Sequence, residues 1–353
     1  MHIIKTALLS YGMSGKIFHA PFIAAHPGFL LAGAWERSHK NIQQDYPEAN
    51  SYPSLEALLA DETIELVIVN TPNNSHFDYA TKVLLANKHV VVEKAFTTTV
   101  AEGEALQALA ERQGKKISVY QNRRYDSDCR TVQKVIAENL LGDIVEAEFH
   151  YDRFKPVVGP KVHKETPGPG AGLLMDLGPH LIDEALHIFG MPQSVFADIR
   201  ITRPLSQVDD WFDILLYYPG LRVRLKASGF VKEAVPANVI HGTKGSFIKT
   251  RGDVQEIDLL AGKKPGGSNW GIEPETEQGL LHTENDGVVI REHIPSCKGN
   301  YGDYYEGVYL ALTTNKPMPV SASEGIRTII IIETAVKSNN EKKVIELSRP
   351  LNN

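Results

Sequence analysis

The first 120 residues alternate short apolar runs with segments of helical spacing, and this alternation constrains the fold more than any other feature of the chain. Uninterrupted apolar runs are typical of strands buried on both faces, and helices between them make successive strands parallel. The runs are Ile3–Leu9, Leu30–Trp35, Leu66–Asn70, His89–Val92 and Ile117–Tyr120. The pattern predicts a doubly wound α/β sheet, with ligand loops at the carboxyl ends of its strands.

After about residue 122 the apolar residues alternate with polar ones instead, which is typical of antiparallel strands with one buried face. The predicted strands are Ala147–Phe154, Ser194–Thr202, Phe212–Tyr218 and Leu221–Ser228. The predicted helices are Thr131–Asn139, Met175–Phe189, Tyr304–Thr313 and Glu324–Lys337. We therefore expect a doubly wound domain over 1–122 and an α+β domain with a large, mainly antiparallel sheet over 123–353.

The second domain also contains two long loops rich in Gly and Pro, Pro156–Gly172 and Gly262–Glu277. Loops of this length inside a compact domain are usually functional. The second face of the large sheet needs a cover, which favours a homodimer or homotetramer.

Composition narrows the possible partners. The 353 residues carry a net charge of −6 without a block of Lys or Arg, so we expect neither nucleic acid nor a membrane as partner. No run of apolar residues is long enough to span a bilayer, and the start of the chain reads as a strand rather than a signal peptide. The two cysteines, Cys129 and Cys297, are interpreted as reduced thiols, which favours a cytoplasmic location, and a disulfide between them is the alternative.

A glycine-bearing turn follows the first strand. Ser10, Gly12, Met13, Ser14 and Gly15 match a dinucleotide-binding fingerprint whose first glycine is replaced by serine. The second glycine allows the backbone to approach a pyrophosphate, and the third allows the helix to pack on the strand. The position of the turn predicts a Rossmann domain that binds NAD(P). A turn without a ligand is the alternative.

The end of the second strand is where a ribose contact is expected. Glu36 suits the 2′-hydroxyl of NAD, whereas Arg37 and Ser38 suit the 2′-phosphate of NADP. The preference between the two cofactors stays open at this point.

Two groups of residues have the chemistry of an active site. Glu93 and Lys94 end the fourth strand, where a lysine can stabilise a developing alkoxide. Asp176 and His180 are four residues apart, so they share a helix face, and a histidine can move a proton near neutral pH. For Glu93 and Lys94, the alternative is an ion pair on the surface. For Asp176 and His180, the alternative is a helix start without a catalytic role.

Further site residues are expected around these two groups. Gln121, Asn122 and Arg123 follow the last strand of the first domain, where they suit either the ligands or an interdomain contact. Tyr151 and His163 are expected near the substrate. The histidines lack zinc-site spacing, so no metal is expected.

The chain resembles the Gfo/Idh/MocA (glucose–fructose oxidoreductase/inositol dehydrogenase) family over its whole length, and most closely the branch that contains NADP-dependent scyllo-inositol dehydrogenase. The landmarks of the resemblance are Thr71-Pro72-Asn73 with His76, Glu93-Lys94, Tyr120-Gln121-Asn122-Arg123-Arg124, Asp176-Leu177-Gly178-Pro179-His180 and His241-Gly242-Thr243-Lys244-Gly245-Ser246-Phe247. Two positions depart from the family pattern: Ser10 replaces a glycine, and Ala95 replaces the proline of Glu-Lys-Pro.

The resemblance implies that Lys94, Asp176 and His180 are the catalytic trio. It also implies that a further set of residues lines the cofactor, namely Thr71, Pro72, Asn73, His76, Glu93 and Asn122. The expected activity is hydride transfer between nicotinamide and a secondary hydroxyl or carbonyl of a polyol or sugar. A nicotinamide-dependent glycosidase, or a nucleotide-sensing regulatory protein without turnover, is the alternative.

Overall fold

The structure is a computed structural model that describes residues 2–36 and 39–347, with residues 162 and 163 described by their backbone only. These residues form two compact units. The first contains the chain up to Tyr125 together with Val254–Trp270 and Asn300–Ile326. The second contains Asp126–Asp253, Gly271–Gly299 and the chain from Arg327 on.

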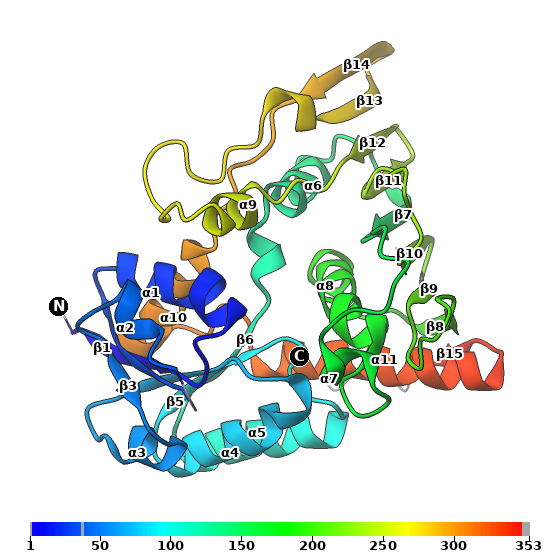
Figure 1. Ribbon diagram of the computed structural model, residues 1–353. Coiled ribbons are helices and arrows are strands. Elements are labelled where there is room, and N and C mark those ends of the chain that lie inside the picture. Colours follow the sequence, from blue (N-terminus) through cyan, green and yellow to red (C-terminus); the bar gives the residue numbers. More distant parts are fainter. Residues whose placement is uncertain (1, 37–38, 348–353) are drawn as a thin grey trace. The chain divides into compact units, whose positions relative to one another are not determined.

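A six-stranded parallel sheet forms the centre of the first unit, and the apolar runs predict five of its strands (Figure 1). Its strands are β1 Ile4–Leu8, β2 Phe29–Trp35, β3 Asn50–Tyr52, β4 Leu66–Val69, β5 His89–Glu93 and β6 Ile117–Tyr120. They lie in the order β3-β2-β1-β4-β5-β6, which is the order of a dinucleotide-binding Rossmann domain. The short strand β3 carries Asn50 and Ser51 and was not predicted, because it lacks an apolar run.

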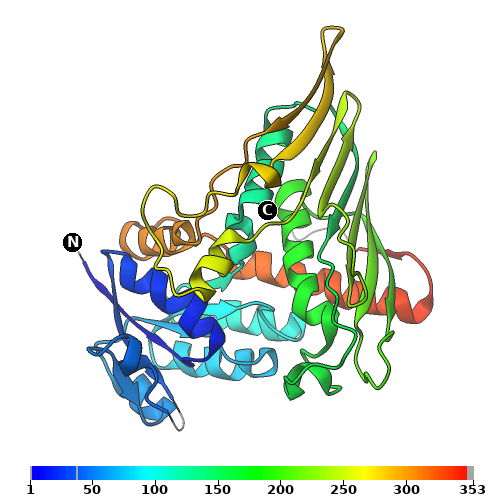
Figure 2. The same ribbon diagram turned by 45° about the horizontal axis from the view of Figure 1, so that its top comes forward.

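Helices cover both faces of this sheet, with α4 and α5 on one face and α1 and α10 on the other (Figures 1 and 2). The longer helices of the unit are α1 Ala20–Ala25, α3 Leu55–Ala60, α4 His76–Leu85, α5 Val100–Arg112, α9 Val254–Leu260 and α10 Gly302–Thr314. The shorter helical turns are a π-helical segment Gly15–His19, α2 Ile42–Asp45, and 3-10 turns at Asn73–Ser75 and Asn122–Tyr125.

Residues 254–270 and 300–326 group with the first unit, although the predicted division at residue 122 assigns them to the second. Tyr304 and Tyr305 of α10 are fully buried. The ring of Tyr304 lies 4.9 Å from that of Tyr120 on β6, and the hydroxyl of Tyr305 lies 2.6 Å from Nδ1 of His19. These aromatic contacts bring a distant segment back onto the first sheet.

The second unit contains a nine-stranded sheet in the order β14-β13-β12-β11-β7-β10-β9-β8-β15. Its strands are β7 Ile144–His150, β8 Ser194–Arg200, β9 Trp211–Tyr218, β10 Leu221–Ser228, β11 Asn238–Gly242, β12 Gly245–Lys249, β13 Gly279–Asn285, β14 Val288–Ile294 and β15 Ile345–Glu346. Neighbouring strands are antiparallel except β7 and β10, which are parallel. The prediction of a large, mainly antiparallel sheet is thus confirmed.

Helices pack against one face of the nine-stranded sheet (Figure 2). They include α6 Ser127–Ala137 and α8 Gly172–Phe189. The helix α7 Val162–Glu165 is a single turn. The long helix α11 Ala322–Glu341 contains residues of both units. On β9, Phe212, Ile214 and Leu216 are fully buried, whereas the alternate residues Leu215 and Tyr217 stay partly exposed. The two faces of this sheet therefore have different environments.

Within the described residues, no helix has both the length and the apolar character that crossing a membrane requires.

Candidate active site

The glycine turn is tied to the neighbouring strand by one side chain. Ser10 N–H donates to Oδ1 of Asn70 at 3.0 Å, and Nδ2 of Asn70 donates to the Ser10 carbonyl at 2.7 Å. A Cβ at Gly15 would lie 2.2 Å from that same carbonyl oxygen, so only glycine fits there. Asn70 was not among the predicted site residues, although its position at the end of an apolar run is the signal that marks it.

The residues present fit a dinucleotide. Gly12 and Met13 are exposed, so the backbone of the turn is accessible at the start of a helix. Pro72 is exposed at the end of β4, and Thr71 and Asn73 are half-buried beside it. The parallel pairing of β1 with β4 brings these two strand ends to the same edge of the sheet.

His76 and Glu93 are buried, whereas the residues named above are accessible at this edge of the sheet. His76 is fully buried, with Nδ1 2.7 Å from the carbonyl oxygen of Ala95 and Nε2 2.8 Å from that of Thr71. Burial lowers the pKa of His76. Glu93 lies 2.9 Å from Nε2 of the buried His19. Burial works to raise the pKa of Glu93, but the hydrogen bond from His19 and nearby positive charges leave it below its usual value.

Glu36 has hydrogen-bond partners at the start of α2 and on β3. Its carboxylate accepts bonds from the backbone N–H groups of Asn41 at 3.0 Å and Ile42 at 3.2 Å, and from the hydroxyl of Ser51 at 3.3 Å. The predicted ribose residues Arg37 and Ser38 lie outside the described residues. Glu36 thus connects the end of β2 to the start of α2 and to β3.

Lys94 follows β5 directly and is half-buried. Its backbone N–H donates to Oε2 of Glu93 at 3.1 Å, and the peptide bond between Lys94 and Ala95 is cis. Glu93 is paired in register with Tyr120 of β6, which brings Lys94 and Gln121 to neighbouring positions.

Gln121, Asn122 and Arg123 are all buried. The guanidinium of Arg123 donates to the hydroxyl of Tyr301 at 2.8 Å and to Glu256 of α9 at 2.7 Å. Arg123, predicted to lie near the substrate, is therefore bound to side chains of its own unit.

In the second unit, α8 carries the other predicted catalytic residues. Asp176, His180 and Glu184 are spaced by four residues, so they lie along one face of the helix. His180 is buried, and its ring centroid lies 6.1 Å from that of Tyr151. The ammonium of Lys164 lies 2.6 Å from Oδ1 of Asp176. The structure thus brings Tyr151 together with His180, and Asp176 with Lys164; Lys164 was not predicted.

A buried cluster of charges lies beside the same helix face. Glu184 accepts a hydrogen bond from Arg251 at 2.9 Å, and Arg251 lies 3.3 Å from Asp128. Burial raises the pKa of Glu184 to about 6. The guanidinium of Arg251 lies 5.1 Å from the centre of the Tyr151 ring, which connects the cluster to the surroundings of His180. These residues come from separate elements, and no local pattern in the sequence identifies them.

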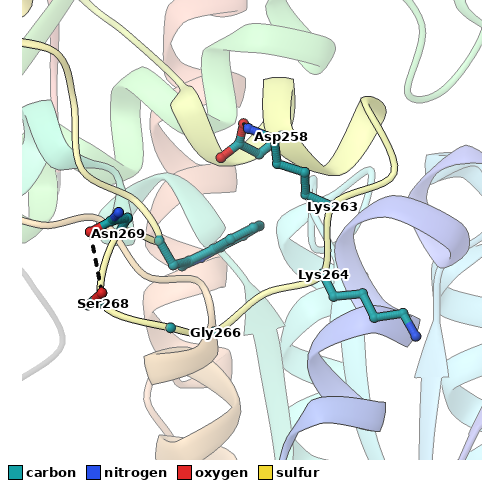
Figure 3. A pocket seen from close by; sticks show the side chains of 8 residues that line it. Asp258, Lys263, Lys264, Gly266, Ser268 and Asn269 are labelled. Carbon is teal, nitrogen blue, oxygen red and sulfur yellow. Dashed lines mark hydrogen bonds and ion pairs between the residues drawn. The ribbon is translucent and has the colours of Figure 1, made fainter.

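A hollow of about 380 Å³ lies in the first unit, beside α9 and the loop from Lys263 to Trp270 (Figure 3). Lys263 is paired with Asp258 at 2.7 Å, and the indole of the buried Trp270 donates to Gln255 at 3.2 Å. The ammonium of Lys264 points away from Asp258. Part of the predicted loop 262–277 is thus anchored in the first unit.

The side chain of His163, a predicted substrate residue, lies outside the described residues. In the part of the chain that is described, no group of three His, Cys, Asp or Glu side chains has an arrangement that can hold a metal ion.

The strand order and the glycine turn define an NAD(P)-binding Rossmann domain. Residues 4–121 match the model of an oxidoreductase family with an NAD-binding Rossmann fold, and residues 133–347 match the C-terminal alpha/beta domain of the same family. The chain belongs to the Gfo/Idh/MocA oxidoreductase family and is an NAD(P)-dependent dehydrogenase or reductase.

Known relatives match the chain over nearly its full length. It is 38% identical to the scyllo-inositol 2-dehydrogenase (NADP(+)) IolW of Bacillus subtilis, over 98% of this chain and 96% of that protein. It is 35% identical to the uncharacterized oxidoreductase YdgJ of Escherichia coli, over 98% and 99% of the two chains. A crystal structure of a putative oxidoreductase from Bacteroides fragilis has 44% identity and a TM-score of 0.91, covering 98% and 100%.

Proposed function

We propose that this protein transfers a hydride between NAD(P) and a secondary hydroxyl or carbonyl of a polyol or sugar related to inositol. The observation that carries the proposal is the placement of Asp176 and His180 one turn apart on α8, with His180 buried beside Tyr151. The naming of a 38% identical relative as a scyllo-inositol 2-dehydrogenase supports the substrate class.

The cofactor-binding residues of the proposal lie at the carboxyl edge of the first sheet. The turn from Ser10 to Gly15 binds the pyrophosphate through backbone N–H groups, and the loop from Thr71 to Asn73 lies beside it. Glu36, Arg37 and Ser38 contact the ribose. Lys94, Gln121 and Asn122 border the nicotinamide. When bound, the cofactor supplies the hydride acceptor or donor.

His76 and Glu93 support this edge from below. Because His76 is fully buried and bridges the carbonyls of Thr71 and Ala95, we assign to it the positioning of the Thr71 loop relative to the turn that carries Lys94. We assign to Glu93 the positioning of Lys94, because its carboxylate accepts a hydrogen bond from the backbone N–H of Lys94.

In the oxidation direction, His180 accepts the proton of the substrate hydroxyl, which requires its neutral imidazole. The ammonium of Lys94 stabilises negative charge on the substrate oxygen. Asp176 orients the substrate, and Lys164 holds the carboxylate of Asp176 in place. Tyr151 restricts the position of the His180 ring.

We also propose that the chain works in the cytoplasm as a homodimer or homotetramer. Both cysteines are free, which suits a reducing compartment. The partly exposed Leu215 and Tyr217 on β9 suit contact with a second copy.

The test is a screen of cyclitols, sugars, their keto forms and their glycosides with NAD(P) in both redox states, read by absorbance of the reduced nicotinamide and by chromatography of any released sugar. Turnover of at least one secondary alcohol or its ketone is expected. Binding of the cofactor without turnover of any compound would instead indicate a nucleotide sensor, and release of a sugar from a glycoside would indicate a glycosidase.

A further inference from the structure

The extended segment that follows β7 carries two cations on one face. Tyr151 N–H donates to the carbonyl of Lys226 at 2.9 Å, and Arg153 N–H donates to that of Ser228 at 2.9 Å. Lys155 N–H continues the pattern at 2.8 Å from Gly229 O. Alternate residues of an extended segment share a face, so Arg153 and Lys155 lie on the same side as Tyr151.

The intervening acidic residue lies on the opposite side. The carboxylate of Asp152 is 3.3 Å from Nδ1 of His150, two residues away on the same face. Its charge is therefore compensated there and does not offset the cations beside Tyr151.

The face with Tyr151 is the one that meets α8. The Tyr151 ring lies 6.1 Å from that of His180, and the guanidinium of Arg153 lies 5.0 Å from the centre of the Tyr151 ring. The charge of Arg153, followed by desolvation and the charges of Lys164 and Lys161, lowers the pKa of Lys155, while the carboxylate of Asp176 works to raise it. Several cations thus gather where α8 carries Asp176 and His180.

The carboxylates near this cluster already have partners. Lys164 binds Asp176 at 2.6 Å, and Arg203 binds Glu165 at 2.8 Å. Within the described part of the chain, neither Arg153 nor Lys155 has a carboxylate at ion-pair distance. The carboxylate of Asp176 attracts Lys155 but is already bound by Lys164. Because Arg153 and Lys155 also repel each other, a bound anion would stabilise this arrangement. A guanidinium beside an ammonium is the usual recognition of carboxylate or phosphate.

We propose that the substrate of this site is an anion, a polyol or sugar carrying a carboxylate or phosphate that Arg153 and Lys155 bind while a hydroxyl of the same molecule reaches His180. The inference rests on the proposed function, because it assigns the substrate class of that site.

The test compares matched neutral and charged compounds on the full chain with saturating oxidised cofactor. The compounds are glucose, glucuronate and glucose 6-phosphate, and myo-inositol with its 1-phosphate, measured by calorimetry for binding and by nicotinamide reduction for turnover. At least one anion should bind ten times or more tighter than its neutral counterpart. The uronate and the phosphates separate the two anionic groups.

Arg153→Gln and Lys155→Gln should each weaken binding of that anion about tenfold, raise KM rather than lower kcat, and leave the neutral compounds unchanged. Lys337→Gln, at an exposed lysine of α11, is the matched control and should have no effect. The inference is overturned if no anion binds more tightly than its neutral counterpart, or if both variants weaken neutral and charged compounds equally.

The outcomes for the two proposals are distinct. Turnover of neutral polyols that does not depend on Arg153 would retain the dehydrogenase and refute the anionic substrate. Tight, Arg153-dependent binding of an anion without turnover of any compound would support the anion site and refute hydride transfer to these polyols and sugars.

Discussion

The carboxylate of Asp209 accepts a hydrogen bond of 2.6 Å from the backbone N–H of Leu174, in the first turn of α8. A Cβ at Gly172, whose φ is +89°, would lie 2.0 Å from Oδ1 of the same carboxylate. The helix that carries Asp176 and His180 therefore begins against a mostly buried acid, and burial raises the pKa of that acid to about 6.

Asp209→Asn should change how stability depends on pH. A carboxyl whose pKa is raised by folding stabilises the native state below its unfolded pKa of about 4, and this stabilisation is lost as the pH rises to about 6. Asparagine keeps an acceptor for Leu174 but does not titrate. From pH 4 to 7 the free energy of unfolding of the variant should gain up to about 3 kcal/mol relative to the parent.

Urea unfolding of both chains at several pH values measures this difference. Asp143→Asn, at an exposed aspartate, is the control and should follow the parent. If the free energy of unfolding of Asp209→Asn and of the parent changed with pH in the same way, a raised pKa of Asp209 would be contradicted.

Gly15→Ala and Gly12→Ala should have different effects. A Cβ at Gly15 meets the Ser10 carbonyl, whereas a Cβ at Gly12 meets only the flexible Ser10 side chain at 3.3 Å. We expect Gly15→Ala to lower the free energy of unfolding by on the order of 1–3 kcal/mol. Gly12→Ala should leave stability nearly unchanged and weaken cofactor binding. Thermal unfolding and cofactor titration measure the two effects, and equal stability loss in both variants would contradict the predicted packing.

The chain should bind both NAD and NADP with a modest preference, because Glu36 repels a 2′-phosphate that Arg37 attracts. Glu36→Gln should improve NADP binding relative to NAD several-fold, and Arg37→Ala should weaken NADP binding on the order of tenfold. Fluorescence titration with each reduced cofactor tests this. If neither substitution alters either affinity, the ribose lies elsewhere.

The partly exposed face of the nine-stranded sheet should form the interface between copies of this chain. Leu215→Lys should dissociate the oligomer, because it adds a charged side chain to a sheet face that we propose is buried between copies. Leu85→Lys, at a leucine that is 60% exposed on α4, should not. Sedimentation velocity measures the oligomeric state. A parent chain that stays monomeric at micromolar concentration is the result that rejects this prediction.

His180→Asn should leave cofactor binding nearly intact and lower turnover on the order of a hundredfold or more, the usual contribution of acid–base catalysis. The oxidation rate of the parent should rise with pH through the range where imidazole loses its proton, and the variant should lose this dependence. Lys94→Ala should also slow turnover. Asp176→Ala should weaken substrate binding and so raise KM, in addition to slowing turnover. Near-normal turnover of His180→Asn with an unchanged pH profile would make Lys94 the better candidate for the proton acceptor.

Local patterns in the sequence were sufficient to predict the parallel sheet, the glycine turn and the pairing of Asp176 with His180 on one helix face. Each of these depends on residues close together in the chain: a run of apolar side chains, the glycines of one turn, or a spacing of four in a helix. The same is true of the alternation on β9 and β10, whose hairpin register follows from Tyr218 and Leu221.

The tertiary structure alone decided which distant residues surround these local features. Asn70 reaches Ser10 because β1 and β4 are neighbours, and Lys164 reaches Asp176 because the loop before α8 folds back on it. Arg153 and His180 both lie beside the ring of Tyr151 because the segment after β7 runs beside the end of β10. Such contacts depend on strand order and loop paths, which many side chains determine together, so no single segment of the sequence encodes them.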